Sequence, residues 1–592
     1  MGEFSKFIFY YRVFKKFTGR KLYILVGLIV LASLTEGIGF SLFAPLFTII
    51  TDGGFASSNN PSLIERIFSD VFNFFGLPST LTSLSIILAV VFLVKGLLTF
   101  IQEIATAFIT KELVQGLRMQ TLEKYNEMSY EYYLEKESGY LSNIIIKEIE
   151  RMVAAFGRYA QVIVSIINII IFAILSAIVS WKISLAGILA ALILLLPMRL
   201  ISKSTNKYSS TTSEKNAALQ QLLSQSVDSL KYLKATNQFH KIRVKLKKEI
   251  SSLATLYFKI RRNEAIISSS KDPITIYIIL GLLAIQLLLF GGDVGVVMVL
   301  LLLFYRMMNR FYILLVSWQA FNANIGGVDT FVSNFDEATL NKETKGGKNI
   351  TKINLSIRLE DINLNFGDFN ALKNINIEIP KDKMIAIVGE SGAGKSTIVD
   401  LICGLIKPSK GSIYVDQFNY KNINIDSLRS MIGFVAQETI IFNDSVENNI
   451  SLWDLGNKDK IREVAKSSNA EEFILSKEDQ YQTIVGDRGE KLSGGQRQRI
   501  SIARELFKEP EFLILDEATS ALDTKTENKI RGSIESLQGT KTILVISHRI
   551  STIKNADYIY LIHKGIIEEE GTYDYLYNLN NRFRKMCDGQ EI

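Results

Sequence analysis

The sequence predicts an all-α transmembrane domain of six helices, followed by a soluble α/β domain built around a phosphate-binding loop (P-loop). Three observations carry this prediction. Long apolar runs are confined to residues 1–330, the later residues alternate polar and apolar side chains, and a glycine-rich loop there follows a short apolar strand. A polar, glycine-containing stretch separates the two kinds of sequence. We place the transmembrane domain at 1–330, a linker at 331–354 and the soluble domain at 355–592.

The composition of the 592-residue chain excludes several classes of protein. The formal net charge of +7 and the mean hydropathy of +0.19 describe a chain with a strongly apolar first part and a polar second part. This division excludes an ordinary cytosolic enzyme and an intrinsically disordered chain. Cys403 and Cys587 are too few for a disulfide framework or a cysteine-based zinc site. Membrane proteins also collect Lys and Arg on cytoplasmic segments, so the basic charge predicts no nucleic-acid partner.

Six apolar stretches are long enough to cross a bilayer, which takes about 20 helical residues. Runs such as Ile163–Val179 are too continuous to be one face of a soluble amphipathic helix. Only Trp181 and Lys182 separate the third stretch from the fourth, which predicts a tight hairpin. The six stretches lie at 22–50, 81–107, 158–181, 183–201, 268–290 and 294–320.

The distribution of charge predicts the orientation of these spans. Lys and Arg cluster before the first span, whereas loop 51–80 carries three acidic residues against Arg66 alone. The positive-inside rule then places the N-terminus and the soluble domain in the cytoplasm, together with the polar segments 110–157 and 203–264. We expect these two segments to extend the membrane helices. Loop 51–80 fits either an amphipathic helix in the outer interface or a lid over the helix tips.

Four cations fall inside the predicted spans, namely Lys95, Lys271, Arg306 and Arg310. At about 1.5 Å per helical residue, Lys271 lies near the cytoplasmic start of its helix and the other three lie in the inner half of the bilayer. Intramembrane cations are costly and usually face a cavity or a partner. One interpretation is a cationic ring that binds an anionic headgroup, and the alternative is snorkelling of each side chain to inner-leaflet phosphates.

The soluble part contains the residues of a nucleotide-phosphate site. The strand Met384–Val388 is followed by the glycine-rich loop and by the helical pattern Ile398–Leu405, and backbone N–H groups in this setting bind phosphates. Lys395 is placed to reach the β- and γ-phosphates, and Ser396 is placed to ligate Mg²⁺. The loop consists of Gly389, Glu390, Ser391, Gly392, Ala393, Gly394, Lys395, Ser396 and Thr397.

Two motifs further along the chain point to hydrolysis of that nucleotide. A buried strand starting at Phe512 ends in Asp516, placed to organise the Mg²⁺ shell, and Glu517, placed to polarise a water for attack on the γ-phosphate. A second set of phosphate-binding donors opens a helix between the P-loop and this strand. One nucleotide needs one P-loop, so the second set predicts a nucleotide held by another copy of the domain. This second set comprises Ser493, Gly494, Gly495 and Gln496.

With these motifs the sequence closely resembles the ATP-binding cassette (ABC) proteins, and six spans before one cassette resemble an exporter-type half transporter. The resemblance implies ATP and Mg²⁺ as cofactors. It also implies a dimer with a second copy of the chain, although a heterodimer stays an alternative. By resemblance, Gln437 contacts Mg²⁺ and the attacking water, His548 bonds the γ-phosphate and Asp523 lies in the loop that contacts the opposite monomer. The implied coupling segments lie near Glu131–Tyr140 and Asn206–Lys215.

One position departs from the family pattern. The aromatic residue that usually stacks on adenine is replaced by Asp368, so Phe369 or Phe366 is expected to stack instead.

Within the exporters, the details resemble bacterial lipid-linked oligosaccharide flippases. The resemblance is carried by segment 51–80, the four intramembrane cations and the stretch Phe442–Ser445. It implies that a polyprenyl-pyrophosphate oligosaccharide moves from the inner to the outer leaflet of the plasma (inner) membrane. The alternatives are an exporter of drugs, glycerolipids or peptides, and an ATP-gated channel or regulator on the same scaffold.

Overall fold

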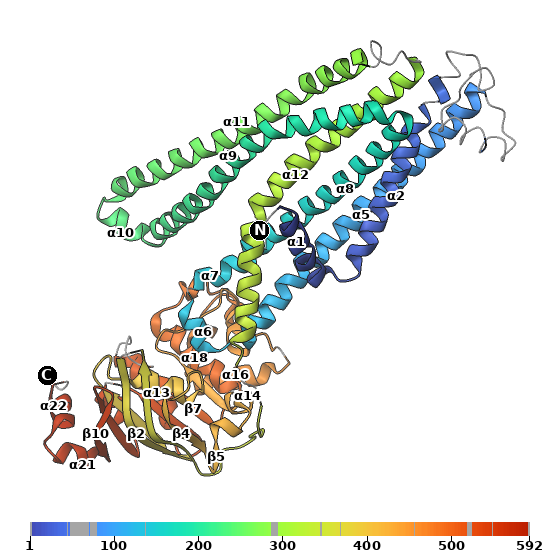
Figure 1. Ribbon diagram of the computed structural model, residues 1–592. Coiled ribbons are helices and arrows are strands. Elements are labelled where there is room, and N and C mark those ends of the chain that lie inside the picture. The colour runs from blue at the N-terminus through green and yellow to red at the C-terminus, as the bar shows by residue number, and fades with distance from the viewer. Residues whose placement is uncertain are drawn as a thin grey trace. The chain divides into compact units, whose positions relative to one another are not determined.

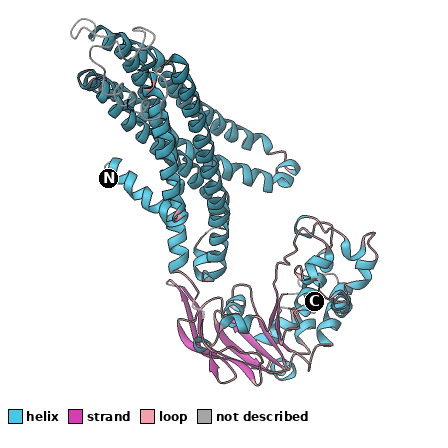
Figure 2. Ribbon diagram, turned by 90° about the vertical axis from the view of Figure 1, so that its right-hand side faces the viewer, coloured by secondary structure: helices cyan, strands magenta, loops and turns pink. Residues whose placement is uncertain are grey.

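The computed structural model divides the chain into two compact units (Figure 1). We call residues 1–127 and 136–341 the helical unit, and residues 128–135 and 342–592 the sheet unit. Coloured by secondary structure, the strands gather in the sheet unit (Figure 2). The structure describes residues 3–43, 45–47, 70, 80–136, 138–285, 294–343, 346–367, 369–454, 456–517, 524–547 and 549–589.

The helical unit contains the predicted membrane helices. By length and composition, five helices among its described residues qualify as membrane spans, and the remaining predicted span, 183–201, lies within α9. The unit comprises α1 Glu3–Thr18, α2 Lys21–Ser41, α5 Leu81–Glu127, α7 Ser138–Asn143, the π-helical turn η2 Ile144–Glu148, α8 Ile149–Val179, α9 Trp181–Asp228, α10 Leu230–Ala235, α11 Phe239–Ile285 and α12 Val294–Leu340.

The long helices continue well beyond the predicted spans. Helices α5, α11 and α12 have 47 residues each and α9 has 48. Such a helix is about 70 Å long, more than twice the thickness of a hydrocarbon core of about 30 Å. The predicted hairpin is also present, because the single extended residue Ser180 separates α8 from α9.

One expected coupling segment lies inside a long helix. Residues 206–215 lie inside α9, and the chain turns only at 229–238, where α10 joins α9 to α11; these two helices run side by side (Figure 1). Residues 206–215 contain no glycine or proline, which would disfavour a helix interior, and α9 continues through them. The turn instead contains Asn237, whose φ of 54° is left-handed.

The predicted linker 331–354 begins inside a helix. Helix α12 continues to Leu340 because Phe331, Phe335 and Ala338 keep a helical apolar spacing, and Phe331 and Phe335 pack in the unit's core. Beyond the helix, the Glu343 carboxylate accepts two hydrogen bonds from the Arg429 guanidinium, at 2.7 and 2.9 Å. This bidentate pair fixes the start of the sheet unit.

The sheet unit contains two sheets. An antiparallel sheet has the order β2-β1-β4-β5, and a second sheet has the order β10-β9-β3-β8-β7-β6, parallel except for β10. Strands β3, β7 and β8 are buried along their whole length, as expected for parallel strands covered on both faces. The strands are β1 Ser356–Phe366, β2 Phe369–Pro380, β3 Met384–Gly389, β4 Lys410–Val415, β5 Phe418–Asn419, β6 Ile432–Val435, β7 Phe512–Asp516, β8 Thr542–Ile546, β9 Tyr558–His563 and β10 Ile566–Gly571.

Short helices connect these strands. The helices used below are α6 Tyr130–Glu135, α13 Lys395–Ile402, α14 Ile425–Arg429, α15 Val446–Ser451, α18 Gly494–Phe507 and α22 Arg582–Asp588. The others are α16 Lys458–Ser467, α17 Glu471–Leu475, α19 Thr524–Glu535, α20 Ile550–Ile553 and α21 Tyr573–Asn578.

Aromatic side chains hold α1 against the rest of the helical unit. The ring of Phe14 is fully buried, with ring centroids of Phe156 at 5.5 Å, Tyr159 at 5.3 Å and Phe321 at 6.4 Å. These partners belong to α8 and α12, so one side chain joins three helices. The Tyr10 hydroxyl adds a polar link by donating to the Asp329 carboxylate at 2.9 Å.

Replacing Phe14 with alanine is therefore expected to destabilise the helical unit by about 3–5 kcal/mol, the usual cost of removing a buried phenyl ring. The measurement is the apparent melting temperature of the purified protein in detergent. Phe9→Ala on the same helix is the matched control, since the Phe9 ring is 43% exposed. Equal melting temperatures for the two variants would contradict the packing role of Phe14.

Candidate functional site

Parallel strands bring the predicted nucleotide residues together at one edge of the sheet. Strand β3 ends at Gly389, where the P-loop begins, and β7 ends at Asp516. Strand β6 ends at Val435, two residues before Gln437. Because the carboxyl ends of parallel strands share one edge, motifs far apart in the sequence meet there, at the usual ligand-binding edge of such sheets.

The P-loop turns sharply between β3 and α13. Gly394, the N-cap of α13, has a φ of 105°, which disfavours residues with a side chain. A Cβ on Gly394 would come within 2.7 Å of the Leu372 side chain, and one on Gly389 would overlap the carbonyl oxygen of Ile562. Positions 389 and 394 therefore require glycine, and the loop can approach phosphates with its backbone N–H groups.

Lys395 lies buried beneath this loop. Its ammonium group donates to the carbonyl oxygens of Gly389 and Glu390, both at 2.9 Å, and burial lowers its pKa. A lysine held this way supplies positive charge at the loop, as phosphate binding requires.

Two oxygen ligands suited to Mg²⁺ lie next to Lys395. The Ser396 hydroxyl donates to the Asp516 carboxylate at 3.4 Å. Burial raises the pKa of Asp516, and the neighbouring charge of Glu517 raises it further. A hydroxyl and a carboxylate so close together fit a hard cation that also binds phosphate oxygens.

The predicted catalytic pair is in direct contact. The side-chain amide of Gln437 donates to the Glu517 carboxylate at 2.6 Å. Glu517 has a φ of 46°, a left-handed conformation that is uncommon for a residue with a side chain, and its N–H donates to the carbonyl oxygen of Ile546 on β8 at 2.9 Å. Such backbone strain is typical of functional sites. The strained turn directs the carboxylate toward Gln437.

The second set of phosphate donors forms the start of α18. Ser493 is its N-cap, and Ser493 and Gln496 close a reciprocal capping box with hydrogen bonds of 3.3 and 3.0 Å. The side chains of Ser493 and Gln496 therefore cap the start of α18 in this structure. The backbone N–H groups of Gly494 and Gly495, at the start of the helix, have no intrahelical acceptor and can receive an anion.

The candidate adenine residues lie at the turn between β1 and β2. Phe366 pairs with Phe369 in the register, and the Phe369 side chain is 67% exposed. The close approach of Gly394 to Leu372 places the start of β2 beside the P-loop. Phe369, three residues before Leu372, is thus available for stacking near the phosphate site. Asp368, Asp523, His548 and most of loop 51–80 lie outside the described residues.

The side chain of Glu390, a predicted P-loop residue, faces the C-terminal helix. Its carboxylate accepts a hydrogen bond from Arg582 of α22 at 2.9 Å, and this bond lowers its pKa. Glu390, His563 and Arg582 are among the residues that line a cavity of about 740 Å³. The Glu390 side chain thus binds Arg582, and only the backbone of Glu390 is available to the phosphates.

A stretch that the sequence analysis linked to cargo has a local structural role. Asp444 accepts hydrogen bonds from Trp453 and Asn448, both at 2.8 Å, and Ser445 caps α15. The stretch Phe442–Ser445 thus forms a capped turn in the sheet unit.

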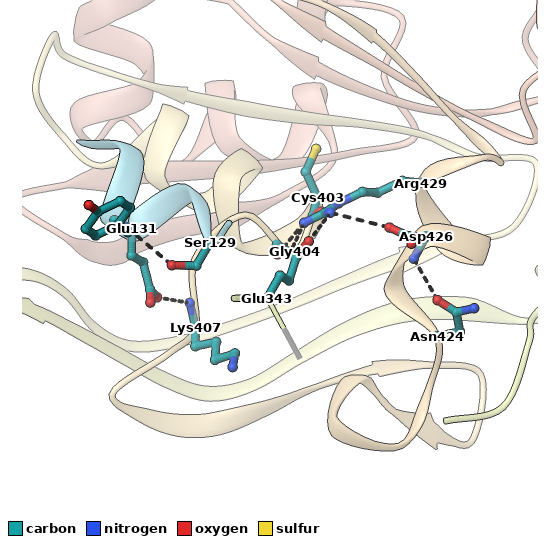
Figure 3. A network of polar contacts seen from close by, with 10 residues as sticks. Ser129, Glu131, Glu343, Cys403, Gly404, Lys407, Asn424, Asp426 and Arg429 are labelled. Atoms are coloured by element: carbon teal, nitrogen blue, oxygen red, sulfur yellow. Dashed lines mark hydrogen bonds and ion pairs between the residues drawn. The ribbon is translucent and has the colours of Figure 1, made fainter. Parts of the chain in front are cut away.

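Helix α6 belongs to the sheet unit although it lies in the chain between α5 and α7. The Glu131 carboxylate accepts a hydrogen bond from the backbone N–H of Lys407 at 3.0 Å (Figure 3). Tyr130 packs against the core of the unit, and burial followed by the charge of Asp400 raises its pKa. Lys407 follows α13, the helix that begins at the P-loop, so α6 contacts the segment behind the nucleotide site.

Within the helical unit, the four intramembrane cations occupy distinct settings. Lys95 at 3.3 Å and Arg310 at 2.8 Å contact the same oxygen of Glu36, a residue on α2. Arg306 lies over the ring of Phe40 at 4.3 Å, and Lys271 lies over the ring of Tyr312 at 5.1 Å. Sequence reasoning missed Glu36 as a partner, although a charged residue inside an apolar span is the signal that would have found it.

A cavity of about 570 Å³ in the same unit was also missed. It includes Arg158 of α8, Thr205 of α9, Arg261 of α11 and Tyr312 of α12. The side-chain nitrogen of Gln319, which also lines it, is buried with no acceptor among the described residues. Tyr312 links this cavity to Lys271. No short sequence motif predicts the cavity, because residues from four helices form its wall.

Comparison with known proteins places the chain in a family. The model for the ABC transporter transmembrane region matches residues 26–311, and the ABC transporter model matches residues 372–520. The heterocyst differentiation ATP-binding protein HepA of Nostoc sp. is 32% identical over 78% of this chain and 77% of its own length. The chain belongs to the ABC transporter family. This ABC transporter is an exporter-type half transporter that hydrolyses ATP, as the sequence predicted.

Two further comparisons cover nearly the whole ABC transporter. An ATP-dependent lipid A-core flippase of Desulfotalea psychrophila is 28% identical over 93% of this chain and 96% of its own length. The structure of a bacterial Atm1-family ABC exporter with ATP bound superposes with a TM-score of 0.78, covering 97% of this chain and 99% of that chain. At 21% identity, the second likeness shows the fold, with both predicted parts in the predicted order.

The contact of α6 with Lys407 leads to a test of coupling. Glu131→Ala is expected to reduce cargo-stimulated ATP hydrolysis about fivefold, in the range of typical coupling free energies, and to leave basal hydrolysis unchanged. The measurement is ATPase activity in nanodiscs with and without a stimulating lipid. Glu135→Ala on the exposed side of α6 is the control. A parallel loss of basal and stimulated activity would mean that Glu131 acts on the nucleotide site itself.

Proposed function

We propose that this ABC transporter moves a lipid with a phosphorylated headgroup from the inner to the outer leaflet of the bacterial plasma membrane. The observation that carries the proposal is the set of cations inside the helical unit, where Lys95 and Arg310 gather on one carboxylate and Arg306 lies one turn from Arg310. Cations at membrane depth usually mark a substrate pathway. Relatives that carry the name lipid A-core flippase support a lipid cargo.

The finer proposal for the cargo is a polyprenyl-pyrophosphate oligosaccharide. A pyrophosphate offers several anionic oxygens to the clustered cations, and a polyprenyl tail can remain in the lipid while the headgroup moves. Drugs, glycerolipids and peptides are the alternatives within the exporters. The test below separates them by the charge of the headgroup.

The 570 Å³ cavity supports a loading position for the headgroup. Its wall includes Arg158, which starts one predicted span, and Ser268, which starts another. Both residues therefore lie at the depth of the inner-leaflet headgroups in the proposed topology, with the N-terminus and the sheet unit in the cytoplasm. Arg158, Gln319 and the hydroxyl of Ser268 can all donate hydrogen bonds to phosphate oxygens.

In the proposed ATPase cycle the P-loop backbone and Lys395 bind the phosphates, and Phe369 stacks on the adenine. Ser396, Asp516 and Gln437 would hold Mg²⁺, which supplies neutralising charge to the phosphates when bound. Glu517 accepts a proton from the attacking water, and the hydrogen bond from Gln437 orients its carboxylate.

The remaining site residues are assigned to a homodimer. We propose that the start of α18, with Ser493, Gly494 and Gly495, faces the nucleotide held by the second copy of the chain. Asp523 then contacts the opposite copy, and His548 bonds the γ-phosphate. The geometry of α18 supports this assignment because the N–H groups of Gly494 and Gly495 have no intrahelical acceptor.

Glu517→Gln is expected to bind ATP normally but to lower turnover by at least about a hundredfold, the usual contribution of a positioned general base. Nucleotide affinity and steady-state ATP hydrolysis are measured in parallel. Glu478→Gln, a change at an exposed glutamate, should behave as wild type. Retention of wild-type turnover in Glu517→Gln would remove Glu517 as the base.

Replacing both Arg306 and Arg310 with glutamine is expected to lower flipping of a pyrophosphate-linked polyprenyl lipid at least about tenfold, because two charge-assisted contacts are lost. Basal ATP hydrolysis should persist. Flipping is measured in proteoliposomes, with a glycerophospholipid and a hydrophobic cation as competing cargoes and Arg12→Gln on α1 as the control. Undiminished flipping of the pyrophosphate lipid would contradict the proposed headgroup site.

A further inference from the structure

Glu36 is an intramembrane carboxylate whose two oxygens are used very unequally. Its side chain is only 4% exposed. One oxygen, Oε2, receives both Lys95 and Arg310, whereas Oε1 is buried and has no hydrogen-bond partner among the described residues. A carboxylate can accept about four hydrogen bonds on its two oxygens. Glu36 therefore holds two cations without saturating either its own acceptors or their donors.

The two cations remain accessible while the carboxylate is covered. The side chains of Lys95 and Arg310 are 22% and 23% exposed. The ammonium group of Lys95 has three N–H donors and the guanidinium of Arg310 has five, and only part of either set can point at one carboxylate oxygen. A second anion can therefore bind Lys95 and Arg310 from their accessible side.

The charge of the cluster favours an incoming anion that carries more than one negative charge. Glu36 supplies one negative charge against two cations, and Arg306 adds a third cation one helical turn from Arg310, over the ring of Phe40. A phosphate monoester carries about −1.5 to −2 charges at neutral pH. A pyrophosphate that joins a lipid to a sugar carries one charge on each phosphate, and a pyrophosphate with a free end carries more. Such a group outcompetes a monovalent carboxylate for the same cations, whereas a neutral headgroup does not.

We propose that Glu36 is a resident counter-ion that the anionic headgroup displaces, and that it thereby sets the minimum charge a cargo must carry. This inference rests on the proposed function and names a specificity-determining residue for it. Without cargo, Glu36 neutralises part of the cluster and keeps Lys95 and Arg310 in place. When a multivalent headgroup binds, the two cations transfer to it, and monovalent and neutral lipids are rejected because they cannot replace the carboxylate.

The experiment measures the concentration at which a ligand half-maximally stimulates ATP hydrolysis by the full-length transporter in phosphatidylcholine nanodiscs. The ligands are a short-chain polyprenyl pyrophosphate, the matching monophosphate, the uncharged polyprenol and inorganic pyrophosphate. In the wild type, the pyrophosphate lipid should act at a lower concentration than the monophosphate, and the polyprenol should not act.

Glu36→Gln should lower the half-maximal concentration of both phosphorylated lipids about tenfold, within the usual range for removing a competing interaction, and narrow the gap between them. Glu36→Asp, which retains the charge, should keep the wild-type discrimination. If inorganic pyrophosphate, and neither phosphorylated lipid, stimulated the Glu36→Gln variant, the counter-ion role of Glu36 would be supported. The ligand would then be a soluble anion. Unchanged or higher half-maximal concentrations in a Glu36→Gln protein of normal thermal stability would overturn the inference.

A double variant tests the same role if the Glu36→Gln protein does not fold. Glu36→Gln combined with Lys95→Gln removes one charge of each sign, so the cluster keeps its wild-type net charge. The counter-ion role predicts that this variant no longer distinguishes pyrophosphate from monophosphate. Retained discrimination would show that Glu36 is not the determinant.

The outcomes also separate this inference from the proposed function. If no phosphorylated lipid stimulated ATP hydrolysis by the wild type but such lipids stimulated the Glu36→Gln variant, the proposed cargo would be refuted. The counter-ion role of Glu36 would be supported. If phosphorylated lipids stimulated the wild type and the Glu36→Gln variant at the same concentrations, the proposed cargo would be supported. The counter-ion role of Glu36 would be refuted. No response from either protein would contradict both.

Discussion

The parallel pairing of β3, β8, β7 and β6 is the constraint on which the nucleotide site depends. Parallel strands end at one edge, so the P-loop after β3, the carboxylates at the end of β7 and Gln437 after β6 meet there. Ser396 and Asp516 lie 120 residues apart in the sequence, and Gln437 and Glu517 lie 80 residues apart. The same geometry produces the strained turn at Glu517, whose N–H is held by Ile546 of β8. Ser396 and Asp516 become neighbours for the same reason.

A different constraint governs the helical unit, where charge is costly. The unit limits that cost in two ways, by pairing Lys95 and Arg310 with Glu36 and by placing Arg306 and Lys271 over aromatic rings. Neither arrangement saturates the donors of these side chains. The unit thus contains cations that are paired among the described residues and retain N–H donors able to bind a further anion.

The two units are connected through the chain at α6 as well as after α12. Residues 128–135 fold as part of the sheet unit between two helices of the helical unit, and Glu131 contacts the backbone just beyond α13. Helix α13 starts at Lys395 of the P-loop, and the chain on either side of residues 128–135 continues into α5 and α7. Within the sheet unit, the contacts of α6 include the hydrogen bond from Lys407 to Glu131 and the packing of Tyr130 against the core.

The sequence by itself determined the two-part architecture, the spans and the P-loop chemistry, because apolar run length, glycine spacing and strand-end carboxylates are local signals. Residues 206–215 and 331–340, expected as a coupling segment and as part of the linker, lie in α9 and α12, where the helix continues through polar residues. Only the tertiary structure decided that Lys95 and Arg310 share Glu36, that Glu390 faces Arg582 and that α6 joins the sheet unit. These contacts join residues remote in the chain, so no local pattern encodes them.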